Sequence, residues 1–257
     1  MNKNGIILWE GKSKLANHRE VNIVVIAVGL KDSKNRKTGK MLQTYILLQD
    51  IDPVEAIKLG FDGAICGKCV HRGDDGFQGR TCYVNVGQGV MSVWKCYQRG
   101  NYPKVESMED IRRVGEGRKV RLGTYGDPMA VPAEIWEALI SRSIMHTGYT
   151  HQWRSARGAR WQKLVMASAD TLGDKVDAWA KGWRTFRVNR DGVKTKGESH
   201  CPASEEMGKI LQCDTCGACN GTRTGRKGSI TIHAHGATAS EKNLDKLDQR
   251  IIVRMAA

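Results

Sequence analysis

The chain has 257 residues, 40% of them hydrophobic, which is enough to bury one large core or two small ones and excludes a disordered polypeptide. Its 41 Lys and Arg outnumber its 27 Asp and Glu, and the net charge of +14 favours a nucleic-acid partner, DNA before RNA, over an anionic membrane. A basic surface without a specific partner is the alternative. The sequence contains neither a signal peptide nor a run of the ~18 apolar residues that span a membrane, so we expect a cytoplasmic protein of a bacterial host.

The first 60 residues are predicted to be rich in β-structure. Two β-branched, apolar runs, 21–30 and 41–50, are typical of strands, and a short helix follows at 52–60. The segment 31–40 between the strands is polar and basic, which predicts an exposed loop. Its cations are candidate contacts to nucleic-acid phosphates, although a solvated turn explains them equally well: Lys31, Lys34, Arg36, Lys37 and Lys40.

Strands and helices alternate in the middle of the chain, at 119–128, 131–141, 146–153, 163–170, 171–182 and 183–189. This alternation predicts βαβ units around a parallel sheet, with functional residues at the carboxyl ends of the strands. We therefore expect an α/β protein: a β/α (TIM-like) barrel, complete or partial, with cysteine-rich metal-binding insertions. The expected divisions are a β-rich segment, a barrel core with the first cysteine group, and a C-terminal metal-binding segment with a closing strand, at 1–60, 61–192 and 193–257.

The helix at 171–182 has a well-marked beginning and end. Thr171 and Asp174 occupy capping-box positions, and Gly182 suits the C-terminal end. The helical spacing of its apolar residues predicts a stripe that faces the core: Leu172, Val176, Trp179 and Ala180.

Polar residues follow three of the expected strands. Asp127 ends the first, Asp170 ends another, and His151 lies near the end of the strand that contains Tyr149. Two carboxylates that face one pocket can divide acid and nucleophile roles, as in the cleavage of a glycosidic bond. The alternative is that both aspartates cap the helices that follow.

Eight cysteines fall into two groups, and an intracellular location argues against disulfides. The second group contains the run CDTCGAC and offers four thiolates, which suit either zinc or a [4Fe–4S] cluster: Cys201, Cys213, Cys216 and Cys219. The first group is less regular and suits zinc, or a three-cysteine cluster with one open iron: Cys66, Cys69 and Cys82, with His71 and Cys96 as further candidates.

A pair of histidines, His233 and His235, lies on the expected strand 229–236. Alternate residues of a strand share a face, so the two imidazoles could bind a divalent metal together, as in a nicking nuclease. Histidines with structural partners are the alternative explanation.

The order of several motifs resembles an uncharacterised phage protein family that is distantly similar to radical-SAM barrels. The motifs span residues 60–236: CGKC, TCYVNVG, VWKCYQRGNYP, VRLGTYGDP, TGYTHQW, MASAD, GWRTFRV, CPAS and CDTCGAC. The resemblance implies a barrel with one cysteine cluster near each end of the chain, and with Asp127 and Tyr149 at its mouth. The chain departs from the radical-SAM spacing C-x3-C-x2-C. A fainter similarity is to the zinc-bearing transglycosylases that exchange guanine for a deazaguanine base.

These features predict a phage or mobile-element enzyme that modifies a base or nucleoside of nucleic acid. A base-exchange mechanism would use Asp127 and Asp170 as nucleophile and acid/base, with Tyr149 and His151 nearby and zinc bound by the cysteines. Three alternatives remain open: a radical-SAM-type enzyme with a [4Fe–4S] cluster and SAM, a non-catalytic zinc protein that binds nucleic acid, and a metal-dependent nicking nuclease.

Overall fold

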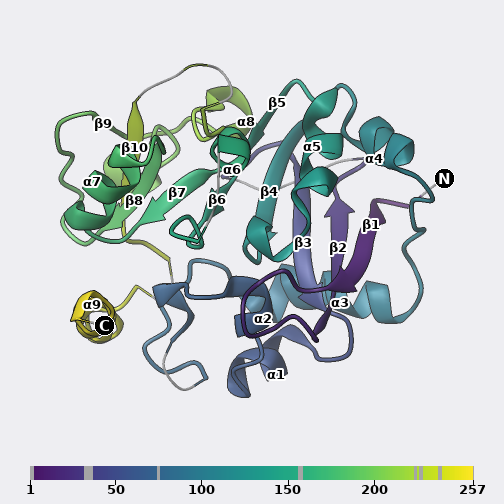
Figure 1. The fold of residues 1–257 in the computed structure, drawn as a ribbon, viewed down its shortest axis with the longest axis horizontal. Coiled ribbons are helices and arrows are strands. Elements are labelled where there is room, and N and C mark those ends of the chain that lie inside the picture. The colour runs from purple at the N-terminus through teal and green to yellow at the C-terminus, as the bar shows by residue number, and fades with distance from the viewer. Residues whose placement is uncertain are drawn as a thin grey trace.

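A computed structural model describes residues 3–31, 37–73, 76–155, 159–222, 225, 228–236 and 239–256 and shows a mixed α/β fold (Figure 1). Two residues of the predicted basic loop, Lys34 and Arg36, lie outside these ranges. None of the helices within the described ranges is long and apolar enough to cross a membrane.

Within the described residues, ten strands form two sheets. The first has the order β1 (Gly5–Lys12), β2 (Asn22–Val28), β3 (Leu42–Leu48), β4 (Lys119–Tyr125), β5 (Met145–Thr147). The second has the order β6 (Tyr149–Thr150), β7 (Met166–Ala169), β8 (Thr185–Asn189), β10 (Ser229–His233), β9 (Glu198–His200). Among the strand pairs of the described residues, only β1–β2 and β2–β3 are antiparallel, so most strands run parallel to their neighbours, as the βαβ alternation predicts.

Gly148 joins the two sheets. β5 pairs with β4 on one side, whereas β6, which begins one residue after Gly148, pairs with β7 on the other. A Cβ atom at this position would lie 2.9 Å from Val165 Cγ1 and 3.0 Å from Leu122 Cβ, so glycine is needed for the close approach. The α/β class is confirmed, while β1 and β9 end the strand orders and no closed barrel is formed within the described residues.

Nine helices accompany these strands: α1 (Pro53–Lys58), α2 (Gly63–Cys66), α3 (Met91–Gln98), α4 (Met108–Gly115), α5 (Ala133–Ser141), α6 (Ala159–Leu164), α7 (Leu172–Ala180), α8 (Cys213–Cys216) and α9 (Glu241–Ala256), counted over the described ranges. α7 packs on β7 and β8, and α5 packs against α4 and α6. In Figure 1, α4 and α5 lie at the upper right beside β4, α7 lies at the left beside β8, and α1 to α3 lie below the first sheet.

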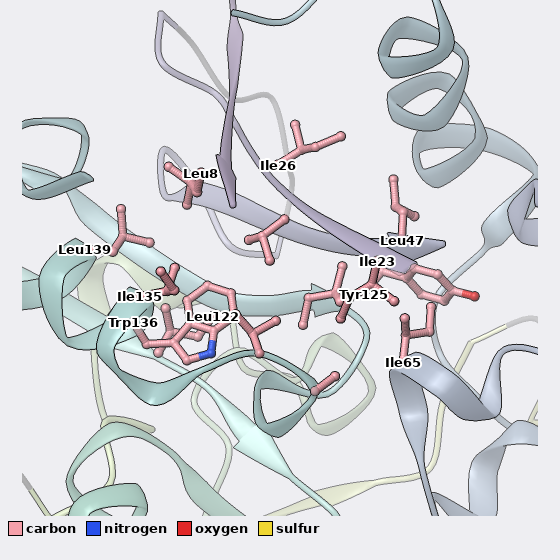
Figure 2. Packing of buried hydrophobic residues seen from close by; sticks show 14 of the residues in the cluster. Leu8, Ile23, Ile26, Leu47, Ile65, Leu122, Tyr125, Ile135, Trp136 and Leu139 are labelled. Atoms are coloured by element: carbon pink, nitrogen blue, oxygen red, sulfur yellow. The ribbon is translucent and has the colours of Figure 1, made fainter. Parts of the chain in front are cut away.

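The largest hydrophobic core lies between the first sheet, α5 and α2 (Figure 2). Ile23, Ile26 and Leu122 are completely buried. Trp136 on α5 is also completely buried, and its indole Nε1 donates a 2.8 Å hydrogen bond to the Pro128 carbonyl oxygen. Because this core fixes the turn that follows β4, it also fixes the carboxyl end of that strand.

The predicted apolar stripe of the helix at 171–182 is wrong. The capping box of Thr171 and Asp174 is confirmed, but Leu172 is 51% exposed and Val176 is 63% exposed. The buried face of α7 instead contains Lys175, whose ammonium donates to the Lys196 carbonyl oxygen. Hydrogen bonding by a lysine therefore outweighs the hydrophobic pattern in the orientation of this helix.

The connection from β3 to β4 determines where the first cysteine group lies. These strands are parallel, so the chain leaves the carboxyl end of β3 and must return to the start of β4. The cysteines at 66, 69 and 82 lie within this connection, and Asp127 N donates a 2.6 Å hydrogen bond to the Ile65 carbonyl oxygen. The connection is thereby attached to the carboxyl ends of the parallel strands, where α/β proteins place their sites.

Candidate metal centre

Three side chains from distant parts of the chain converge at this edge. His71 comes from the cysteine-rich connection, His151 follows β6, and Asp170 follows β7. Their ligand atoms all lie within 4.8 Å of one another, with Asp170 Oδ1 3.4 Å from His71 Nε2 and 3.2 Å from His151 Nε2. The side chains are 13%, 16% and 3% exposed, so the group is shielded but accessible.

These spacings suit one metal ion. Ligand atoms at about 2.0–2.1 Å from a tetrahedral zinc ion are about 3.3 Å from each other. His71 Nδ1 lies 2.8 Å from Thr81 Oγ1, which leaves Nε2 directed at Asp170. Such a hydrogen bond to the other ring nitrogen fixes the orientation of a metal-binding imidazole. Cys69 Sγ lies 3.9 Å from His151 Nε2 and is the nearest candidate for a further ligand.

Charge interactions within the group are strong. Burial alone would lower the pKa of His151, but Cys69 and Asp170 raise it well above its usual value. Burial alone would raise the pKa of Asp170, but His151 and His71 hold it well below its usual value. Without a metal ion, the carboxylate and the imidazoles therefore stabilise each other's charged forms.

Asp127 holds the backbone next to the centre through hydrogen bonds to both of its carboxylate oxygens. Its Oδ1 accepts hydrogen bonds from Met129 N (3.0 Å) and Thr150 Oγ1 (2.7 Å). Its Oδ2 accepts from His151 N (2.8 Å) and from the Gln152 side-chain amide (3.4 Å). Burial raises the pKa of this carboxyl. The carboxylate thus positions the backbone of His151, and the confirmed capping of Met129 N agrees with the alternative that Asp127 caps a turn.

The thiols of the first cysteine group interact with one another, and Cys69 is the one with a contact to the centre. Burial raises the pKa of Cys66 well above its usual value, and the charges of Cys69 and Cys82 raise it further. The neighbouring Arg80 is 3% exposed and Tyr125 is 2% exposed. Arg80 Nη2 and Tyr125 Oη have no hydrogen-bond partner among the described residues. Buried polar atoms of this kind are rare without a partner.

The second cysteine group forms a separate cluster on the second sheet. Cys201 and Cys219 are buried with Met166, Ile230 and Ile232. Burial raises the pKa of the Cys219 thiol to about 12, with further contributions from Cys201 and Cys213. All eight cysteines are free thiols in the structure. Within the described ranges, the sulfur atoms of this group do not all lie close enough together to bind one ion, so a metal there remains a prediction.

Tyr149 belongs to this second cluster rather than to the centre. Its ring lies 4.2 Å from that of Phe186, and the Arg121 guanidinium lies 4.4 Å from its centroid. Burial raises the pKa of Tyr149 well above its usual value, and the Cys219 thiol contributes to the increase. Of the four predicted catalytic residues, the structure brings together Asp127, His151 and Asp170 and places Tyr149 elsewhere.

The histidines that suggested a nuclease do not form a metal site in the described part of the chain. His235 Nδ1 lies 2.7 Å from the His233 carbonyl oxygen, and its Nε2 lies 2.5 Å from Lys37 Nζ. Both ring nitrogens of His235 are therefore engaged. The other described cations of the predicted basic loop, Lys31 and Lys40, are exposed.

The C-terminal helix α9 packs against the cysteine-rich connection. Leu244, Leu247 and Ile251 of α9 pack against Val70. The Arg250 guanidinium donates a 2.6 Å hydrogen bond to the Gly79 carbonyl oxygen. These contacts fix the segment that carries His71 against α9.

Any function assigned to this chain rests on the geometry of the site, because comparisons with known proteins found no match: no protein-family model, no curated protein and no solved structure matches this chain. The resemblance to a phage family similar to radical-SAM barrels therefore stays a prediction.

Proposed function

We propose that the protein is a metal-dependent enzyme that modifies nucleic acid, with the ion bound by His71, His151 and Asp170. The convergence of these three ligand atoms, at 3.2 and 3.4 Å, carries the proposal. Two imidazoles and one carboxylate are typical of catalytic zinc and of non-haem iron, and they leave coordination positions for water or substrate. The net charge of +14 supports a polyanionic substrate.

An ion in this position would polarise a substrate oxygen or lower the pKa of a bound water. The residues of the chain would orient it: Thr81 through His71, and Asp127 through the backbone of His151. The sequential order of the parallel strands from β4 to β8 is compatible with a partial β/α barrel, and its carboxyl edge would form the active-site face.

The base-exchange mechanism has less support than metal-assisted chemistry. It needs two carboxylates that face the substrate, whereas both oxygens of Asp127 accept hydrogen bonds from the surrounding chain. Asp170 lies between two imidazoles, which suits a ligand better than a nucleophile.

An iron–sulfur enzyme, including one of radical-SAM type, is the second candidate. It is favoured by the mutual interaction of Cys66, Cys69 and Cys82, by the contact of Cys69 with His151, and by the buried polar atoms of Arg80 and Tyr125 that lack partners in the described structure. A polynuclear cluster spreads its cysteines more widely than a single ion does, because the thiolates bind different irons.

Metal analysis of protein purified without oxygen tests both candidates. We expect wild type to contain at least one zinc, iron or manganese ion per chain that His71→Ala and His151→Ala both remove. His200→Ala, in β9, is the matched control and should retain the full metal content. Retention of all metal by both variants would overturn the proposal. Iron with an equal amount of acid-labile sulfide would favour the second candidate.

Conversion of nucleic acid is measured on the same proteins. Wild type is incubated with single-stranded DNA, duplex DNA and tRNA, and the digested nucleosides are analysed by mass spectrometry. A new or missing nucleoside that depends on His151 supports the function. Unchanged nucleosides with bound metal would favour a non-catalytic zinc protein.

A further inference from the structure

Three side chains from separate segments meet near the metal centre: Lys37, Tyr83 and His235. The ring centroids of Tyr83 and His235 are 4.9 Å apart, at an interplanar angle of 60°. Lys37 Nζ lies 4.9 Å from the Tyr83 centroid and 2.5 Å from His235 Nε2. An aromatic ring, an ammonium group and an imidazole thus form one compact group, the Tyr83 platform.

The two partners of Tyr83 lie on the same side of its ring. Groups on opposite faces, each 4.9 Å from the centroid, could not approach each other to the 2.5 Å that separates Lys37 from His235. Despite these contacts Tyr83 is 56% exposed. A tyrosine ring buries much apolar area when it packs in a core, so one held in place yet exposed is suited to receive a ligand.

The hydrogen bonds place the positive charge of the platform on the lysine. The His233 carbonyl oxygen can only accept, so His235 Nδ1 donates to it at 2.7 Å. His235 Nε2 then accepts from Lys37, as a neutral imidazole does. The ammonium is thereby oriented beside the Tyr83 ring by a fixed partner.

The platform adjoins the metal centre. Tyr83 directly follows Cys82, whose backbone N donates a 3.0 Å hydrogen bond to the carbonyl oxygen of His71. His235 lies two residues beyond the end of β10, which runs parallel to β8. The carboxyl ends of β7, β8 and β10 therefore lie along one edge, with the metal centre and the platform beside it.

We propose that the Tyr83 platform binds single-stranded nucleic acid next to the metal centre, with a base stacked on Tyr83 and a phosphate paired with Lys37. Stacking on an exposed aromatic side chain and pairing with a cation are the two contacts that single strands need. The inference rests on the proposed function for its substrate and extends that function by assigning a binding position. A stacked base also explains why an aromatic side chain is exposed beside a lysine.

Binding of a fluorescein-labelled dT12 oligonucleotide, followed by fluorescence anisotropy, tests the proposal. We expect Tyr83→Ala to weaken binding by about 5- to 150-fold, the range for loss of one stacked base. Tyr83→Phe should bind like wild type, because stacking uses the ring and not the hydroxyl. Lys37→Ala should lower the slope of log K against log salt by about 1. Phe61→Ala, which removes another aromatic side chain, 46% exposed, is the matched control and should change neither quantity.

An abasic oligonucleotide of the same length separates stacking from loss of structure. Its affinity should be the same for wild type and Tyr83→Ala. Equal weakening with dT12 and with the abasic strand, or unchanged binding of dT12 by Tyr83→Ala, would overturn the proposal. The metal content of Tyr83→Ala should equal that of wild type. A failure of the stacking proposal can therefore be told apart from a failure of the proposed metal centre.

Discussion

The substitution Asp127→Asn tests whether the Asp127 carboxylate positions the candidate metal ligands or takes part in the reaction itself. The substitution preserves shape but turns one carboxylate oxygen into an amide donor. If Oδ1 is kept for Met129 N and Thr150 Oγ1, the new amide faces His151 N and the Gln152 side-chain amide, which are both donors.

The expected cost follows from these contacts. A hydrogen bond to a charged group contributes about 1.5–3 kcal/mol, and a buried donor without a partner costs about as much. The 2.8 Å bond from His151 N is lost completely, while the 3.4 Å bond from Gln152 is weak. Burial of the charge, which raises the pKa of Asp127, offsets part of the loss. We expect the free energy of unfolding to fall by about 3 kcal/mol, or Tm by roughly 6–12 °C.

Urea unfolding and metal titration check this expectation. The variant should be less stable and should bind metal more weakly, because the backbone of His151 loses its anchor. Asp177→Asn, an exposed carboxylate on α7, controls for the change of charge and should behave like wild type. Wild-type stability and metal affinity combined with complete loss of turnover would refute the reasoning and assign Asp127 to catalysis.

Two further predictions concern the second sheet. Glu198 pairs with Arg187 through two hydrogen bonds of 2.8 and 2.9 Å, and this pairing outweighs burial and lowers the pKa of Glu198 from 4.5 to about 2. The pair should stabilise the fold fully above pH 4.5, and this contribution should be lost as the pH falls towards 2. The stability of Glu198→Gln, followed by circular dichroism, should therefore depend less on pH in this range than that of wild type. An unchanged dependence on pH would contradict this. Cys213→Ser should remove the metal predicted at the second cysteine group and leave that bound by His71 and His151, whereas unchanged metal content would make these cysteines buried thiols.

Much of the fold follows from local patterns in the sequence. Apolar β-branched runs correctly predict β2 and β3, and the alternation of strands and helices predicts the parallel sheet. The capping box of Thr171 and Asp174 begins α7 where expected. Such features depend on neighbours in the chain, so they are readable without tertiary structure. The position of Asp127 and Asp170 at strand ends is predictable for the same reason.

Only the tertiary structure decides which of these residues work together. His71 lies two residues after Cys69 in the sequence, but the other candidate ligands of its group are 80 and 99 positions away, at His151 and Asp170. The return of the chain from β3 to β4 brings them together, and no local spacing encodes that path. Tyr149 and His151 are two residues apart, yet they belong to different clusters, because Tyr149 packs within β6 against the second cysteine group whereas His151 follows the end of that strand. Sequence therefore determines the elements and the chemistry available at their ends, while the packing of distant elements determines which side chains share a site.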